Sequence, residues 1–391
     1  MLIKRLTLKK ILSFNDSTVE LGPLNVLICP NAVGKSNLIE AISLLKAAPT
    51  GIEGQILRGG GIRQWLWLGD RAPADWAEVE CELTLPHRQQ LGPLFYRLDF
   101  LGGLEGFEVL HERLMDGPSD NPETRAYFMR ASKGLGFGEL ALELAEAQPA
   151  GIVIPSKESV FARFKNPVDP TPITEVGGCF EQIRIFREFR TGPTSQARFG
   201  ISTNAPKDSL SEGGDNLALV LHELDFLGVH DRITAYLKRF CERFEDVKVN
   251  VGEGLARSFL REAGLSEMLS AIRMSDGTLK FLCLLAVLFD PKPAPLVCIE
   301  EPELGLHPDS LRLVADALVE ASERTQLIVT THSEALVDAL SDRPESVLVC
   351  ERDFDNGTQF KRLSRNDLDS WLEHYTLGEL WRKGEIGGGR W

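Results

Sequence analysis

The sequence predicts an α/β fold with a mostly parallel core sheet, an antiparallel β lobe and a helical lid insertion. Three patterns support this prediction. The apolar run Leu24–Cys29 is followed by a turn-rich stretch and then by apolar residues at helical spacing. Between residues 78 and 110, several segments alternate apolar and polar residues, as half-buried antiparallel strands do. From residue 296 onward, predicted strands and helices alternate, which is typical of a parallel sheet covered by helices.

The first elements follow from side-chain periodicity. Leu2–Leu8 alternates apolar and basic residues, which predicts an edge strand with one buried face, and Thr18–Leu21 is its expected partner. Leu24–Cys29 predicts a buried strand, and Ser36–Ala47 predicts a helix whose apolar residues lie three and four positions apart. Pro49–Gly61 is rich in glycine and is predicted to be a loop.

The same reasoning applies to the later elements. Alternating segments predict strands at Glu78–Leu85, Phe95–Phe100 and Phe107–Leu110. Amphipathic patterns predict helices at Leu217–Phe226 and Arg232–Phe244. In the last third, the predicted order is strand Leu296–Ile299, helix Ser310–Ser322, strand Gln326–Thr330, helix Glu334–Leu340 and strand Ser346–Cys350.

Composition limits the class of protein. The chain has 391 residues, of which 43% are hydrophobic, and this is enough for a large buried core. Because the net charge is −14, DNA contact would require a local basic patch. The seven cysteines are scattered and form no CxxC pair, and the longest apolar run has nine residues. These features predict a cytoplasmic protein that does not span a membrane.

The segment between the buried strand and the first long helix predicts a phosphate-binding loop. Its residues are Pro30, Asn31, Ala32, Val33, Gly34, Lys35, Ser36 and Asn37. They nearly complete the pattern G-x-x-x-x-G-K-[ST], except that Cys29 replaces the first glycine, which lets a chain turn without steric cost. Backbone N–H groups of such a loop surround the phosphates of ATP. Lys35 reaches the β- and γ-phosphates, and the Ser36 hydroxyl ligates Mg²⁺.

A pair of carboxylates follows a later buried strand. Leu296–Ile299 is apolar, and Glu300 and Glu301 come directly after it. This arrangement predicts ATP hydrolysis, with Glu300 at the hydration shell of Mg²⁺ and Glu301 as the general base that polarises the attacking water. The alternative interpretation is an acidic loop that caps the next helix.

A third motif precedes an apolar helix. Ser275 is a natural N-cap, and Gly277 exposes backbone amides, so the start of this helix can bind an anion. Taken alone, the pattern also fits a capped core helix. Ser275 lies 25 residues before Glu300, and here the sequence resembles the ABC ATPase superfamily. The resemblance implies a P-loop NTPase of ABC-ATPase type in which Ser275, Asp276 and Gly277 contact ATP bound by a second copy.

Two further segments extend this resemblance. His332 ends a predicted strand 31 residues after Glu301 and is similar to the switch histidine, which contacts the γ-phosphate as a catalytic residue. Leu304–Pro308 corresponds to the D-loop, which crosses the dimer interface in this superfamily. The Ser-Asp-Gly-Thr form at 275–278 resembles RecF- and OLD-like ATPases. The resemblance covers about half the chain and implies a homodimer closed through an ATP sandwich.

The motif positions imply a division of the chain and of its function. We expect residues 1–69 and 271–391 to form the two parts of the ATPase head, and residues 70–270 to form the antiparallel lobe and helical lid. About forty residues follow the ATPase motifs, so a nuclease or toxin effector is expected to be a separate protein. Head dimerisation would then regulate this effector in anti-phage defence. The alternatives are a RecF-like DNA-binding repair ATPase, a non-hydrolysing ATP sensor and a transporter subunit.

Three further groups of residues have candidate roles. Arginines interleaved with aromatic residues are a candidate DNA contact, with an exposed helix face over two core aromatics as the alternative: Arg184, Arg187, Arg190 and Arg198 with Phe186 and Phe189. Gln182 is a candidate for the Q-loop glutamine of ABC ATPases. Phe14 could stack on adenine or belong to the core.

Overall fold

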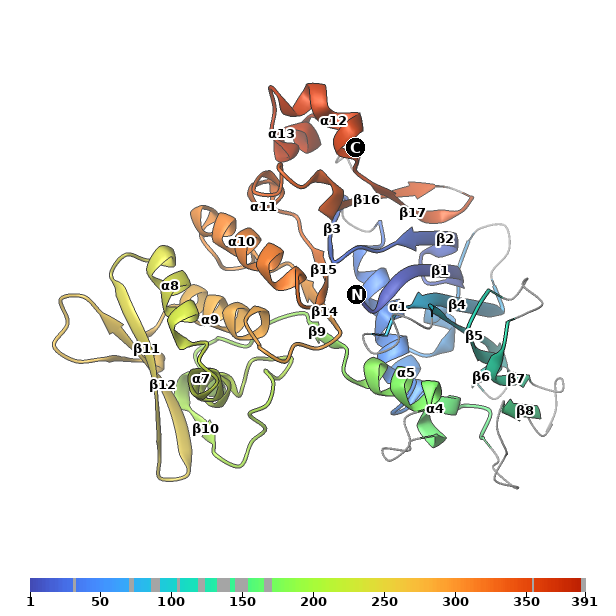
Figure 1. Ribbon diagram of the computed structural model, residues 1–391, viewed down its shortest axis with the longest axis horizontal. Coiled ribbons are helices and arrows are strands. Elements are labelled where there is room, and N and C mark those ends of the chain that lie inside the picture. Colours follow the sequence, from blue (N-terminus) through green and yellow to red (C-terminus); the bar gives the residue numbers. More distant parts are fainter. Residues whose placement is uncertain are drawn as a thin grey trace. The chain divides into compact units, whose positions relative to one another are not determined.

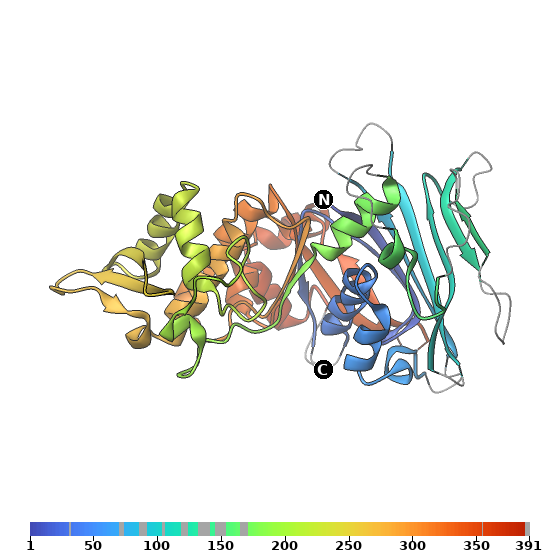
Figure 2. The same cartoon turned by 90° about the horizontal axis from the view of Figure 1, so that it is seen from below.

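The computed structural model shows two compact units (Figures 1 and 2). Unit 1 comprises Met1–Ile183, Leu348–Leu363 and Ile386–Trp391, and unit 2 comprises Arg184–Val347 and Ser364–Glu385. The structure describes residues 1–30, 33–69, 74–85, 92–103, 106–118, 124–131, 141–144, 154–164, 171–353 and 355–387. The units reflect compactness, whereas the predicted division at 69/70 and 270/271 rests on motifs and stays a prediction.

Unit 1 is built around a sheet with the strand order β8-β7-β6-β5-β4-β1-β2-β17-β16-β3. Its strands are β1 (Ile3–Ile11), β2 (Phe14–Glu20), β3 (Leu24–Ile28), β4 (Trp76–Leu83), β5 (Leu94–Gly103), β6 (Gly106–Met115), β7 (Ala126–Ala131), β8 (Ala141–Leu144), β16 (Val347–Asp353) and β17 (Gly357–Arg362). Successive strands from β8 to β2 pair antiparallel, and so do β2 with β17 and β17 with β16. The antiparallel part is therefore larger than the predicted lobe.

Strand β1 is not at a sheet edge, so this detail of the prediction is wrong. It pairs with β2 on one side and with β4 on the other. The basic side chains that indicated a solvent-facing edge lie opposite glutamates of β4. Lys4 Nζ is 3.0 Å from Glu82 Oε1, and Lys9 Nζ is 3.0 Å from Glu78 Oε1. The alternation correctly indicated two different faces, but cross-strand charge pairs account for the polar one.

Helices of unit 1 lie on one face of this sheet (Figure 2). They are α1 (Lys35–Ala47), α2 (Ile52–Arg58), α3 (Ile62–Trp65), α4 (Val160–Arg163) and α5 (Pro172–Glu181). Helix α2 occupies a segment predicted to be a loop. It forms because Ile52 and Ile56, four residues apart, are both buried, and this packing outweighs the low helix propensity of the surrounding glycines.

Unit 2 contains two sets of strands. Strands β9 (Arg184–Phe186) and β15 (Gln326–Thr330) both pair parallel with β14 (Leu296–Glu300). A smaller sheet contains β10 (Ile201–Ser202), β11 (Phe244–Gly252), β12 (Leu255–Glu262) and β13 (Leu269–Ser270), all paired antiparallel with β12. Parallel pairing, as the sequence predicted for the core sheet, is present between β9 and β14 and between β14 and β15.

Helices of unit 2 pack beside these strands (Figure 1). They are α6 (Gln196–Phe199), α7 (Leu217–Phe226), α8 (His230–Phe240), α9 (Asp276–Leu288), α10 (Leu311–Ser322), α11 (Glu334–Asp338), α12 (Arg365–Leu372) and α13 (Leu377–Lys383), with 3₁₀ turns η2 (Ala271–Arg273), η3 (Pro308–Ser310) and η4 (Pro344–Ser346). Helix α8 ends four residues before its predicted limit, because Cys241 is extended and leads into β11. No helix in the described part of the chain is long and apolar enough to cross a membrane.

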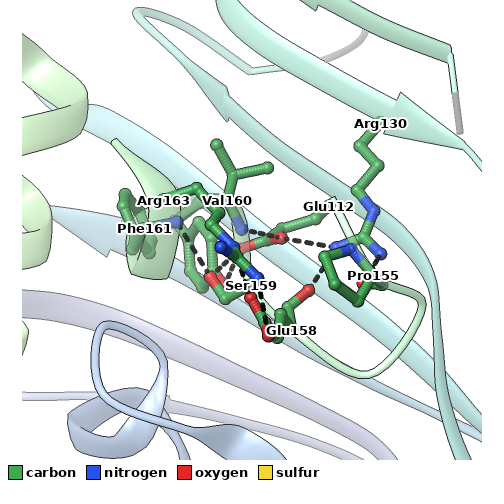
Figure 3. Close-up of polar contacts among 9 residues, drawn as sticks. Glu112, Arg130, Pro155, Glu158, Ser159, Val160, Phe161 and Arg163 are labelled. Carbon is green, nitrogen blue, oxygen red and sulfur yellow. Dashed lines mark hydrogen bonds and ion pairs between the residues drawn. The ribbon is translucent and has the colours of Figure 1, made fainter. Parts of the chain in front are cut away.

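A buried ion pair connects the segment before α4 to the antiparallel strands (Figure 3). Glu112 on β6 and Arg130 on β7 have fully buried side chains, with Glu112 Oε2 3.6 Å from Arg130 Nη1. The Glu112 carboxylate accepts hydrogen bonds from the Ser159 hydroxyl at 2.5 Å and the Val160 N–H at 2.8 Å. Arg130 donates to the Pro155 carbonyl oxygen at 2.8 Å. These contacts attach residues 155–160 to the sheet.

Candidate functional site

The predicted phosphate loop lies in unit 1 between β3 and α1. The structure describes Pro30, Val33, Gly34, Lys35, Ser36 and Asn37 of this loop, whereas Asn31 and Ala32 lie outside the described residues. Strand β3 is buried along its whole length, so it forms a rigid support for the loop. Lys35 is buried and its Nζ donates a hydrogen bond to the Cys29 carbonyl oxygen at 2.8 Å. Ser36 is exposed in the first turn of α1, where backbone N–H groups favour an anion.

Gly34 is required by its backbone angle and by its surroundings. It is the N-cap of α1 with φ 125°, and a Cβ atom there would collide with the hydroxyls of Thr358 and Ser13. The Thr358 hydroxyl lies within hydrogen-bond distance of the Ser13 hydroxyl, at 2.8 Å, and of the Val33 carbonyl oxygen. Thr358 on β17 and Ser13 beside β2 therefore support the phosphate loop, although Thr358 lies 325 residues from Val33 in sequence.

Cys29 is accommodated at the position of the missing glycine. The described non-glycine residues with a positive φ are Lys10, Leu12, Glu253 and Glu301. Cys29 is not among them, so its Cβ atom causes no strain of the left-handed kind. A hydrogen bond from the Cys350 thiol lowers the pKa of Cys29, and the nearby Lys35 lowers it further, while burial acts in the opposite direction. The backbone at Cys29 therefore does not need the conformational freedom of glycine.

A cavity adjoins the phosphate loop within unit 1. Its volume is about 580 Å³ and it is lined by Leu12, Ser13, Val33, Asn37, Gln64, Leu66, Trp67, Leu68, Gly69 and Arg352. Val33 and Asn37 belong to the loop and to α1, so the cavity opens beside the predicted phosphate position. An apolar and aromatic lining with a few polar groups is typical of a site for a small ligand.

Phe14 does not line this cavity. Its side chain is fully buried and stacks on Phe360 with ring centroids 5.7 Å apart. The core interpretation of Phe14 is therefore confirmed, and the adenine interpretation is wrong. The aromatic side chain that does line the cavity is Trp67, from the segment 66–69 that follows α3.

The predicted acidic residues lie in unit 2 at the carboxyl ends of β14 and β15. Glu300 is the last residue of β14, and Glu301 follows it with φ 46°. A non-glycine residue in this left-handed region stores strain of about 1–3 kcal/mol. The Glu301 N–H donates to the Thr330 carbonyl oxygen at 2.9 Å. His332 Nε2 lies 3.7 Å from Glu301 Oε1, so the structure brings the two predicted catalytic residues together.

Glu303 is a third carboxylate at this place, and the sequence motifs do not predict a role for it. Its Oε1 accepts hydrogen bonds from the Thr331 hydroxyl at 2.7 Å and from the His332 N–H at 2.8 Å. Burial raises the pKa of Glu303, and the nearby Glu301 raises it further, while these hydrogen bonds oppose the shift. Glu303 therefore positions the backbone that bears His332. The sequence signal that could have indicated this role is the position of Glu303 two residues after Glu301 in the same acidic stretch.

The signature segment forms the start of α9. The Ser275 hydroxyl is the N-cap and accepts a hydrogen bond from the Thr278 N–H at 3.0 Å. Asp276 forms an ion pair with Arg198, whose guanidinium also donates to the Met274 carbonyl oxygen at 2.6 Å. Arg198 thus neutralises Asp276 and secures the turn before the helix.

Gly277 contacts the D-loop. A Cβ atom at Gly277 would lie 2.8 Å from the Gly305 carbonyl oxygen, which is closer than real Cβ contacts allow. Lys280 Nζ also donates to the Leu304 carbonyl oxygen at 3.2 Å. The predicted signature and D-loop are therefore packed against each other in unit 2, and this contact requires glycine at position 277.

The structure confirms that the two aromatic residues of the arginine cluster belong to the core, but the predicted helix face is wrong, because Arg184–Phe186 form strand β9. Phe186 and Phe189 are buried and pack against each other with ring centroids 5.6 Å apart. Arg190 forms an ion pair with Asp215, and Arg198 is buried beside the signature. Gln182, the candidate Q-loop glutamine, is the C-cap of α5 and lies before the amino end of β9. The residue that follows the carboxyl end of β9 is Arg187.

The oxygen donors present fit Mg²⁺. The metal prefers carboxylate and hydroxyl oxygens and water, usually with only one or two protein carboxylates. The Ser36 hydroxyl is exposed at the start of α1, and the Glu300 carboxylate terminates a parallel strand. In α/β sheets, ligands bind beyond the carboxyl ends of strands, and within unit 2 Glu300 lies at such an end.

Comparisons with known proteins agree with the motif analysis. Residues 182–338 match the family described as "AAA domain, putative AbiEii toxin, Type IV TA system". The chain is 25% identical to an OLD nuclease from Thermus scotoductus over 393 aligned residues, which cover 96% of this chain and 68% of that protein.

Solved structures show the same fold at low sequence identity. An Smc head bound to the C-terminal winged-helix domain of ScpA superposes with a TM-score of 0.58 at 14% identity, covering 93% of this chain and 99% of that one. An Smc head from Pyrococcus furiosus, with an extended coiled coil and bound to the C-terminal domain of ScpA, gives 0.57 at 15% identity, covering 95% and 98%. The solved structures show that the chain has the α/β fold of an Smc head. The Gly34–Ser36 loop, the two glutamates Glu300 and Glu301 and the two relatives make the chain similar to P-loop ATPases of the ABC/RecF/OLD type.

Proposed function

We propose that this chain binds MgATP and hydrolyses it to ADP and phosphate. The observation that supports this most directly is the phosphate loop, with Gly34 and Lys35 at the start of α1, beside a cavity of about 580 Å³. Helix N-terminal amides and Lys35 suit a triphosphate, and the cavity with Trp67 suits a nucleobase. The Ser36 hydroxyl and the Glu300 carboxylate are the proposed metal ligands.

Glu301 and His332 are the proposed catalytic residues. Glu301 accepts the proton of a water molecule whose oxygen forms a bond to the γ-phosphorus. The bond between that phosphorus and the bridging oxygen breaks, and ADP leaves with the electron pair. His332 lies 3.7 Å from Glu301 and can donate a hydrogen bond to the γ-phosphate. The strained backbone at Glu301 and the hydrogen bond from the His332 N–H to Glu303 keep both side chains at the same strand ends.

ATP binding is proposed to close a homodimer. In that state Ser275, Asp276 and Gly277 of one copy contact ATP bound by the other. The ion pair of Asp276 with Arg198 supports this role, because a neutralised carboxylate does not repel a phosphate. Since one relative is an OLD nuclease, we further propose that closure regulates a separate nuclease or toxin effector in anti-phage defence.

Light scattering of the Glu301→Gln variant tests the ATPase and dimer proposals together. The variant keeps the loop that binds ATP but lacks the general base, so MgATP should convert it to a species of twice the mass. Lys35→Ala in the same background should abolish this shift. Glu323→Gln, an exposed carboxylate at the end of α10, is the matched control and should hydrolyse ATP like the wild type.

The outcomes separate the parts of the proposal. ATP binding without a mass change would refute the dimer proposal and leave nucleotide binding intact. Undetectable ATP binding by the wild type would refute the function as a whole. Hydrolysis that survives in Glu301→Gln would refute the assignment of the general base.

A further inference from the structure

A salt bridge connects the proposed metal ligand to an arginine outside the recognised motifs. Arg187 Nη1 lies 3.1 Å from Glu300 Oε1. The Glu300 side chain is largely buried, at 15% exposure, whereas that of Arg187 is 44% exposed. The carboxylate is therefore fixed at the strand end, while the guanidinium has room to leave it.

The sheet register explains why these two residues meet. Strands β9 and β14 are parallel, with Arg184 opposite Val297, Ile185 opposite Cys298 and Phe186 opposite Ile299. One step further along the same register, the residue after β9 comes opposite Glu300. Arg187 thus reaches the carboxyl edge of the sheet, where bound ligands of α/β proteins lie.

The neighbours of Arg187 hold its backbone in place. Phe186 and Phe189 are buried and in contact, so the segment between them is anchored at both ends. Arg190, the other exposed arginine here, forms its ion pair with Asp215 instead of Glu300. Of the two exposed arginines Arg187 and Arg190, Arg187 is therefore the one that contacts Glu300.

We propose that Arg187 is a positioning residue that competes with Mg²⁺ for the Glu300 carboxylate and so sets the Mg²⁺ concentration at which the protein binds ATP. A guanidinium has donors only and cannot itself ligate a metal, so a cation bound at Glu300 and the Arg187 charge exclude each other from the same oxygen. Arg187 holds the Glu300 carboxylate in one orientation when the metal is absent. This inference rests on the proposed ATP and Mg²⁺ site.

The test measures ATP binding as a function of Mg²⁺ concentration in the Glu301→Gln background, where hydrolysis does not interfere. Replacing Arg187 by Gln should lower the half-maximal Mg²⁺ concentration about fivefold, the ratio that corresponds to an ion pair of about 1 kcal/mol. Arg187→Lys keeps the positive charge and should stay close to the parent. Arg190→Gln, on the same segment but paired with Asp215, is the matched control and should leave the Mg²⁺ dependence unchanged.

Each result decides the question. If Arg187→Gln binds ATP with an unchanged or higher Mg²⁺ requirement, the inference is wrong while the proposed function stands. If Arg190→Gln gives the same shift, the effect is one of general surface charge and the assignment to Arg187 fails. If the Glu301→Gln parent binds no ATP at any Mg²⁺ concentration, the proposed function fails and this inference with it.

Discussion

Replacing Glu112 by Gln should destabilise unit 1 strongly. The Glu112 carboxylate accepts hydrogen bonds from the Ser159 hydroxyl, the Val160 N–H and, at 2.9 Å, the Tyr96 hydroxyl, and it lies beside the Arg130 charge (Figure 3). A glutamine of the same shape presents an N–H₂ group to donors and leaves the buried guanidinium without its counter-ion.

The size of the effect follows from burial. Both side chains are fully buried, and breaking such a pair by removing one partner costs about 3–5 kcal/mol, because an uncompensated charge stays in a medium that solvates it poorly. With a urea dependence of about 2–3 kcal/mol per molar, the unfolding midpoint should fall by roughly 1–2 M. The loss should appear first as faster amide exchange in residues 155–160, which Glu112 and Arg130 attach to the sheet.

A double variant separates the charge effect from the loss of packing. Glu112→Leu with Arg130→Met removes both charges, so it should recover part of the loss seen in Glu112→Gln, although the Pro155 carbonyl oxygen loses its donor. Urea unfolding followed by tryptophan fluorescence and by circular dichroism measures both variants. A fall of less than about 0.5 kcal/mol for Glu112→Gln would show that the pair is solvated or unimportant, and would contradict the reasoning.

Three further predictions concern the proposed site. Gly277→Ala should lower the thermal midpoint by several degrees, since overpacking against the Gly305 carbonyl oxygen costs about 1–3 kcal/mol, whereas Gly178→Ala in open space on α5 should be neutral or stabilising. Trp67→Ala should weaken ATP binding about tenfold, as loss of base stacking does, but leave tripolyphosphate binding unchanged; equal weakening of both ligands would remove Trp67 from the base site. Burial raises the pKa of Glu303 above its ordinary value of 4.5, so its contribution to stability is complete below that value and is lost as the pH rises through the folded-state pKa. Glu303→Gln keeps the oxygen that accepts from Thr331 and His332, so its stability relative to the wild type should increase across this range; a constant difference in urea midpoints would contradict the assignment.

Local patterns in the sequence were sufficient to place the chemistry on the chain. Lys35 and Ser36 were predicted at the start of a helix after a buried strand, and Glu300 and Glu301 at the end of another, and the structure confirms these positions. Such predictions succeed because hydrophobic periodicity and contiguous motifs are properties of neighbouring residues. The role of His332 at the γ-phosphate follows only from the resemblance to ABC ATPases, and its proximity to Glu301 comes from the structure.

Which residues meet across long sequence separations was decided by the tertiary structure alone. Arg187 and Glu300 meet because β9 and β14 pair in one parallel register, and Thr358 supports the loop at Val33 because β17 pairs with β2. The tertiary structure also decides that Trp67 lines the cavity, whereas Phe14 stacks on Phe360 in the core. Periodicity shows that a face is buried, but it contains no information about which distant strand or loop covers that face. This choice depends on the register and packing of the whole sheet, and these in turn depend on residues far apart in the sequence.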